Sequence, residues 1–116
     1  MTRTTLSRWI LLAGLAFVFL YFGIDKFVHP KIWIGWMPDR MDGLLGIGND
    51  RWLSLIGATE IAIGVMLLIP IRIVQKVGTA LAVLHLLGIL TQVGWNDIAV
   101  RDIGLLLMGA ALWFLI

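Results

Sequence analysis

The most informative part of the chain is a run of 16 residues without a charged side chain, Trp9-Ile-Leu-Leu-Ala-Gly-Leu-Ala-Phe-Val-Phe-Leu-Tyr-Phe-Gly-Ile24. As an α-helix this run rises about 24 Å, and flanking residues close the gap to a hydrocarbon core roughly 30 Å thick. Three similar apolar stretches follow it. We therefore predict four membrane-spanning helices in a single domain of residues 1–116, at about residues 8–27, 52–70, 76–94 and 98–116.

The composition of the whole chain supports this interpretation. Of its 116 residues, 60% are hydrophobic and only 14% are charged, and the mean hydropathy is +0.99. Soluble domains average about 25% charged residues. The chain therefore has too few polar residues to cover a globule in water. We expect an all-α, integral membrane four-helix bundle that is antiparallel and has a long interfacial loop between its first and second helices.

The charge and the absence of cysteine exclude several functions. A dispersed net charge of +2 gives no basis for a nucleic-acid partner. Without cysteine the chain has no disulfide, thiolate metal site or dithiol chemistry of its own. We find no phosphate-binding glycine loop, metal-ligand spacing or Ser-His-Asp arrangement. Haem ligation by His29 and His85 is disfavoured by their different depths. No metal is therefore predicted, and an unaided enzyme is disfavoured.

The first apolar run also has features of a cleaved signal peptide, because Arg3 and Arg8 precede it. The run is long, however, and no Ala-x-Ala-like cleavage site follows it before Lys26. We therefore expect it to be retained as the first membrane helix.

Tryptophan and basic residues predict how the bundle sits in the membrane. All six tryptophans fall at or near predicted helix ends, as aromatic belts do, and segment 31–38 is expected on the membrane surface. Four Lys and Arg residues lie on the side of the termini and five on the other, so the raw numbers do not decide the orientation. The four are packed into two short segments, and this density predicts that both termini are cytoplasmic.

Glu60 and His85 are the ionisable residues placed deepest in the predicted membrane, where each costs about 2.5–3.5 kcal/mol on insertion. By helical rise both lie about 13 Å from the outer boundary, on consecutive helices. Gly57 and Gly64 share the face of Glu60, and Gln92 shares the face of His85. Three interpretations remain open: a structural clasp with a hydrogen bond, a protonatable site for a quinone head group, a proton or a small polar ligand, or two unpaired side chains.

A second polar cluster is predicted at the outer edge, where the first helix ends and the fourth begins. It contains Asp25, Lys26, Asn96, Asp97, Arg101 and Asp102. Opposite charges at one depth predict a salt bridge of Arg101 with Asp25 or Asp97, although charged helix ends at an interface are ordinary. The candidates for ligand or proton binding all fall in the outer half, which predicts a cavity that opens outward; they are Glu60, His85, Lys26, Asp25, Gln92, Arg101 and Asp102.

Three short motifs carry a family resemblance. The first helix has Arg8, Gly14, Phe17, Gly23, Lys26-Phe27, Pro30 and Trp33, the second has Gly57-Ala-Thr-Glu60-Ile-Ala-Ile-Gly64, and the fourth starts with Arg101-Asp102-Ile-Gly-Leu-Leu-Leu. Together they resemble the DoxX family of small four-helix membrane proteins of bacteria and archaea, over nearly the whole chain. The residues that match family positions are Lys26, Glu60, Arg101 and Asp102, whereas His85 is not part of that pattern.

The resemblance implies a multi-pass protein of the bacterial or archaeal cell (inner) membrane, and some relatives are subunits of thiosulfate:quinone oxidoreductases. We therefore expect an accessory subunit of a quinone-linked redox complex, with quinone as its only candidate cofactor. The expected partners are the lipid bilayer and either further copies of the chain or other membrane redox subunits.

Two alternatives remain open. The first is a small transporter or channel that uses Glu60 as a protonatable site, although small multidrug exporters carry their glutamate in the first helix. The second is a structural membrane protein with a Glu60–His85 clasp.

Overall fold

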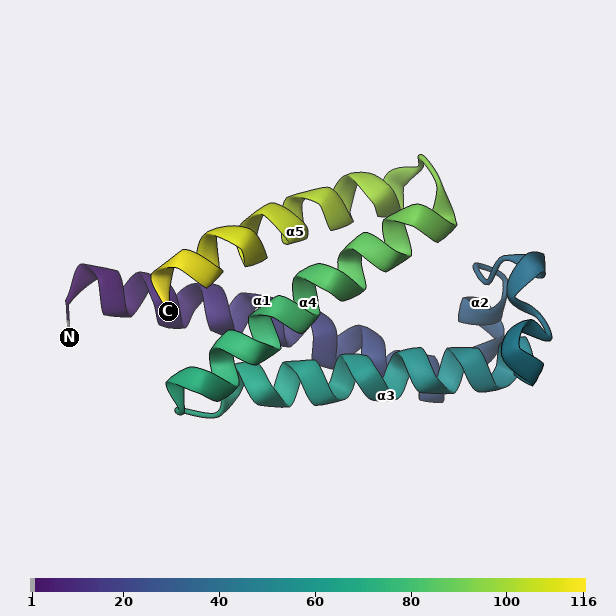
Figure 1. Cartoon of the computed structure of the whole chain (residues 1–116), viewed down its shortest axis with the longest axis horizontal. Helices are drawn as coiled ribbons and strands as arrows, with labels where there is room; N and C mark the ends of the chain where they lie inside the picture. The colour runs from purple at the N-terminus through teal and green to yellow at the C-terminus, as the bar shows by residue number, and fades with distance from the viewer. Residues whose placement is uncertain (1) are drawn as a thin grey trace.

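Four long helices make up most of the chain (Figure 1). The computed structural model describes residues 2–116, apart from the side chain of Val93. The long helices are α1 (Arg3–Val28), α3 (Asn49–Leu68), α4 (Arg72–Val93) and α5 (Asp97–Leu115). Each is long and apolar enough to cross a membrane, and the described residues contain no strand. The predicted all-α class with four apolar helices is confirmed.

Local chemistry explains where these helices begin and end. α1 starts before the predicted residue 8, because the Thr2 hydroxyl accepts a hydrogen bond of 3.1 Å from the Thr5 amide. Asn96 caps α5 in the same way, at 3.0 Å. Residues 69–71 separate α3 from α4, and Pro70 in this connection has no amide hydrogen to donate to a helix.

The molecule has two different ends (Figure 1). Both termini lie at one end of the long axis, which we call the terminal end. The connection between α1 and α3 lies at the opposite end, the loop end, and contains α2 (Pro30–Ile34) and two short 3-10 turns, Asp39–Met41 and Leu44–Gly46. Both α2 and the first of these turns contact α3. The connection therefore folds back against the helices.

The solid core lies towards the terminal end and receives apolar side chains from all four long helices. Its most enclosed members have no exposed surface; they are Leu12, Ala16, Leu67, Ala82 and Leu112. Large apolar side chains are also exposed on every long helix. An exterior of this kind suits lipid better than water.

Candidate functional site

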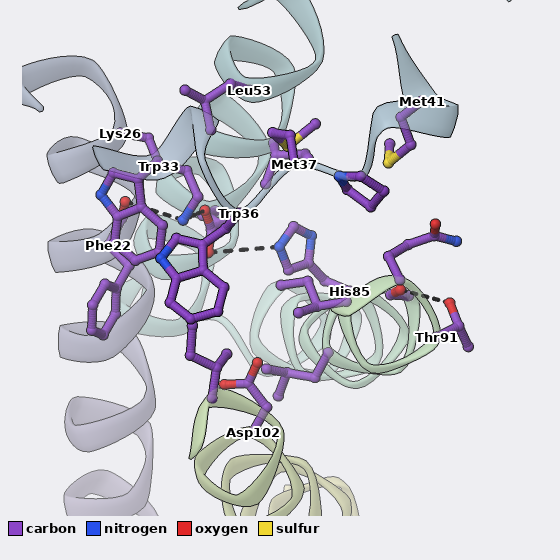
Figure 2. Close-up of a pocket in the computed structure, with 18 of the residues that line it drawn as sticks. Phe22, Lys26, Trp33, Trp36, Met37, Met41, Leu53, His85, Thr91 and Asp102 are labelled. Carbon is purple, nitrogen blue, oxygen red and sulfur yellow. Dashed lines mark hydrogen bonds and ion pairs between the residues drawn. The ribbon is translucent and has the colours of Figure 1, made fainter. Parts of the chain in front are cut away.

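A cavity of about 520 Å³ lies at the loop end, between the four long helices and the α1–α3 connection. Much of its wall is apolar and consists of Val18, Phe19, Phe22, Leu53, Ile56, Leu86, Ile89, Ile98 and Leu105. Six of the seven candidate residues line it: Lys26, Glu60, His85, Gln92, Arg101 and Asp102. Figure 2 shows Lys26, His85 and Asp102 reaching the cavity from three different helices. The seventh candidate, Asp25, is not in the wall.

A close contact between α1 and α3 determines where Glu60 lies. A Cβ atom added to Gly23 would lie 2.9 Å from the Gly57 carbonyl oxygen, and one added to Gly57 would lie 3.1 Å from the Gly23 carbonyl oxygen. Only glycine at both positions allows the two backbones to approach so closely. Each glycine stands three residues before a charged residue, Lys26 on α1 and Glu60 on α3. The contact therefore brings these two charges side by side.

Lys26 and Glu60 form a buried ion pair across this contact. The Lys26 Nζ lies 2.6 Å from Glu60 Oε1, and the side chains are only 8% and 7% exposed. The same Nζ lies 3.4 Å from the Phe22 carbonyl oxygen and 4.1 Å from the centre of a Trp33 ring, in cation–π geometry. From the sequence we expected Lys26 in the outer polar cluster, so its pairing with Glu60 was not predicted. The matched spacing of the two glycines was the signal that could have revealed it.

His85 reaches Glu60 from α4. Its Nε2 lies 3.6 Å from Glu60 Oε2, which is beyond the usual hydrogen-bond distance of about 2.7–3.2 Å. The imidazole is mostly buried, and its ring packs edge-on against Phe19 with ring centres 5.7 Å apart. The structure thus brings the two side chains within 3.6 Å of each other without the hydrogen bond that the clasp interpretation expects.

The predicted salt bridge of Arg101 with Asp25 or Asp97 is wrong, because Arg101 pairs with its neighbour Asp102. The Arg101 Nε and Nη2 donate to Asp102 Oδ1 at 3.1 and 3.0 Å, and the guanidinium lies 4.5 Å from the centre of the Phe22 ring. Asp102 is 1% exposed, and its Oδ2 has no hydrogen-bond partner among the described residues. Asp102 points inward from α5, so the long Arg101 side chain reaches it from the adjacent position.

Asp25 lies outside the cavity wall and is hydrogen-bonded to Trp33, which is part of that wall. Its carboxylate accepts a hydrogen bond of 2.8 Å from Trp33 Nε1 and is hydrogen-bonded to His29 Nδ1 at 2.7 Å. Successive helical residues point about 100° apart, so Asp25 turns away from the side on which Lys26 meets Glu60. Its hydrogen bond from Trp33 holds the indole ring in the place where it packs on Lys26.

Gln92 lies at the edge of the cavity, where it is paired with Arg40, which was not among the candidate residues predicted from the sequence. Arg40 Nη2 and Nε donate to the Gln92 side-chain oxygen at 2.8 and 3.2 Å, and Nη2 donates to the Gln92 carbonyl oxygen at 3.3 Å. Both residues are exposed and line the cavity. The pair therefore ties the α1–α3 connection to α4.

The α1–α3 connection contributes a wall that sequence reasoning did not foresee. Trp33, Trp36, Met37 and Met41 all line the cavity, and the two tryptophans lie on the Lys26 side of it in Figure 2. The mixture of tryptophan and charge in this segment is typical of a membrane surface. This composition does not indicate that the segment also folds back over a cavity.

Comparisons with known proteins find no matching family model, no matching curated protein and no matching solved structure. The resemblance to the DoxX family therefore stays a prediction. Within the described residues, no group of three or more His, Asp and Glu side chains is placed to hold a metal ion.

Proposed function

We propose that the chain crosses a cell membrane four times, as an antiparallel bundle, and that its cavity binds the head group of a small amphiphilic compound of the quinone type. The observation that carries this proposal is a cavity of about 520 Å³ with an apolar wall and several buried polar side chains. Small-molecule and cofactor sites commonly occupy roughly 300–1,000 Å³ and have this kind of lining.

The proposed role is that of an accessory subunit, which holds the compound for a partner in a membrane redox complex. The four residues that match DoxX positions support it, because Lys26, Glu60, Arg101 and Asp102 all line the same cavity. They come from the end of α1, the middle of α3 and the start of α5. Residues of three motifs that are distant in sequence therefore meet at one candidate binding site.

The charges of the site favour a neutral ligand. In the inner part of the cavity Lys26 and Arg101 contribute two positive charges, and their partners Glu60 and Asp102 contribute two negative ones. The exposed Arg40 lies at the edge on the neutral Gln92. An ionic ligand would bring an uncompensated charge into an apolar surrounding, which is costly. A quinone head group is neutral, flat and apolar apart from its oxygens, and the aromatic wall suits it.

Proton-coupled transport through Glu60 is the second candidate, because Glu60 stands between Lys26 and His85 in the cavity. Lys26, however, already neutralises the carboxylate at 2.6 Å. A transported cation would have to displace Lys26 before it could use that charge. A purely structural role is the third candidate, in which the Lys26–Glu60 pair joins α1 to α3.

Binding of a short-chain benzoquinone to the purified protein in lipid nanodiscs, measured by calorimetry, tests the proposal. We expect saturable binding that weakens about tenfold in Glu60→Gln, because Lys26 loses the carboxylate that holds it in the cavity wall. Gln75→Met is the matched control, since Gln75 is buried outside the cavity and its replacement should leave affinity unchanged. Absence of saturable binding would overturn the proposal. Unchanged affinity with a large loss of thermal stability in Glu60→Gln would favour the structural role.

Cysteine labelling tests the proposed orientation, because the chain has no cysteine of its own. Trp36→Cys in the α1–α3 connection should react with an impermeant maleimide added outside intact cells. Ser7→Cys, near the start of α1, should react only after the cells are opened. The opposite pattern would reverse the proposed topology.

A further inference from the structure

The hydrogen-bond donors and acceptors in the cavity wall differ in whether they have a partner inside the protein. The three cationic side chains in its wall already serve internal partners. Lys26 Nζ contacts Glu60 Oε1, Arg101 donates twice to Asp102 Oδ1, and Arg40 donates three times to Gln92. Each of these charged donors therefore already has an internal partner, and Arg40 and Arg101 are exposed.

Three buried side-chain atoms of the cavity wall have no hydrogen bond within the described chain: Glu60 Oε1, His85 Nε2 and Asp102 Oδ2. Glu60 Oε1 has Lys26 Nζ beside it at 2.6 Å, and His85 Nε2 has Glu60 Oε2 at 3.6 Å, so the atom left without a counterpart is the acceptor Asp102 Oδ2. Asp102 Oδ2 is buried and accepts no hydrogen bond from the part of the chain that the structure describes. The residue is 1% exposed, and it lines the cavity (Figure 2). Asp102 is ion-paired with Arg101, and an ionised carboxylate can only accept hydrogen bonds. A buried acceptor without a donor is unfavourable, so a ligand that supplies a donor gains affinity at this atom.

The charge balance restricts what that donor can be. Glu60 and Asp102 are each paired with a cation, and Arg40 adds a third positive charge at the edge of the cavity, so an ammonium group would add a further uncompensated charge. A carboxylate or phosphate would carry further acceptors and negative charge towards Asp102. A neutral hydroxyl group on an apolar ring satisfies the oxygen and suits the wall.

We infer that the cavity selects the hydroxylated form of its ligand, a hydroquinone or related phenol, and holds one hydroxyl group on Asp102 Oδ2. The inference rests on the cavity being the binding site proposed above. A quinone carbonyl has only lone pairs to offer and would face the Asp102 oxygen without a hydrogen bond. The hydroxyl of the corresponding hydroquinone donates to it.

Three matched probes test the inference on the unaltered protein. They are a short-chain hydroquinone kept reduced under argon, the quinone of the same ring, and its dimethyl ether, which keeps the shape but has no donor. We expect the hydroquinone to bind at least tenfold more tightly than either of the others, by calorimetry in nanodiscs. This comparison requires no variant, so a folding defect cannot obscure it.

Asp102→Asn then assigns the effect to one atom. Arg101 requires an acceptor, so the amide oxygen should keep the place of Oδ1 and the amide NH₂ should replace Oδ2. The site then offers a donor where it offered an acceptor, and the preference should reverse in favour of the quinone. Gln75→Met, which leaves the cavity intact, should retain the preference for the hydroquinone.

The outcomes separate the two proposals. Equal affinities for hydroquinone and quinone would overturn the selection of the hydroxylated form and leave the proposed binding function intact. Failure of all three probes to bind would overturn the proposed function as well. A preference for hydroquinone that persists in a folded Asp102→Asn protein would show that another group accepts the hydroxyl, and would overturn the role of Asp102.

Discussion

The two ends of the bundle use the same four helices in opposite ways. Towards the terminal end, side chains such as Leu12, Leu67 and Leu112 are packed so closely that they have no exposed surface. At the loop end the helices enclose a cavity of about 520 Å³ around buried charges. Helix packing alone therefore does not explain the loop end.

Buried polar groups distinguish the two ends more sharply than burial itself. At the terminal end Thr79 is fully buried, and its hydroxyl donates to the Gln75 carbonyl oxygen one turn earlier at 2.8 Å. At the loop end the polar side chains pair between helices, as Lys26 does with Glu60, and Asp102 retains an unpartnered oxygen. Gln75 Nε2 at the terminal end is also buried without a hydrogen-bond partner in the described chain, but Gln75 does not line the cavity, whereas Asp102 does.

The largest expected effect comes from breaking the ion pair at the loop end. Lys26→Met leaves the Glu60 carboxylate buried without its cation, which should cost about 3–5 kcal/mol of stability. The double variant Lys26→Met/Glu60→Met should recover most of this loss, because neither charge then remains unpaired. Unfolding of the purified protein in mixed micelles measures both.

Lys76 provides the matched control at the terminal end. Its Nζ lies 4.6 Å from the centre of a Trp113 ring, just as Lys26 lies over Trp33, but no carboxylate is paired with it in the described chain. Lys76→Met should therefore cost about 1 kcal/mol or less. Equal losses for Lys26→Met and Lys76→Met would show that the ion pair contributes nothing specific.

The next effect contrasts two leucines. Leu67→Ala in the solid core should cost about 2–5 kcal/mol, because it removes buried methyl groups and leaves a void. Leu53→Ala should cost less, since Leu53 borders a space that already exists. Ligand affinity should change in the opposite sense, with only Leu53→Ala altering it. Thermal unfolding with and without the benzoquinone measures both quantities, and a ligand effect confined to Leu67→Ala would contradict the comparison.

A smaller effect is expected at the glycine contact that aligns the ion pair. Gly57→Ala places a Cβ atom 3.0 Å from a ring carbon of Phe27 and 3.1 Å from the Gly23 carbonyl oxygen, so it should cost about 1–3 kcal/mol. Gly104→Ala is the control, because a Cβ there meets nothing within 4 Å. It should be neutral or should stabilise by about 0.5–1 kcal/mol through helix propensity. Equal effects in unfolding experiments would argue against a tight α1–α3 contact.

Much of the fold could be predicted because long apolar runs have few structural solutions. The 16 uncharged residues from Trp9 to Ile24 require internal backbone hydrogen bonds in lipid, and a helix supplies them. Helical rise placed Glu60 and His85 at one depth, and the structure brings them within 3.6 Å. These inferences depend only on spacing along single helices.

What could not be predicted depends on how helices and loops pack in three dimensions. The partner of Arg101 follows from the inward direction of Asp102, which its place at the end of a helix does not reveal. The fold-back of the α1–α3 connection involves Arg40 and Gln92, 52 positions apart in sequence. No periodic pattern links such distant residues, so their contact had no signal in one sequence.

The Arg40–Gln92 pair gives the smallest expected effect on stability and a distinct effect on ligand kinetics. Both residues are exposed, so Arg40→Gln should change the free energy of unfolding by about 1 kcal/mol or less. The connection that it holds carries Trp36 and Met37 in the cavity wall, so its release should let the benzoquinone dissociate several-fold faster. Stopped-flow displacement measures that rate, with Arg51→Gln as an exposed control outside the cavity wall. If Arg40→Gln leaves the dissociation rate unchanged, the connection closes the cavity without this pair and is held by its other contacts, such as the hydrogen bond from Trp33 to Asp25.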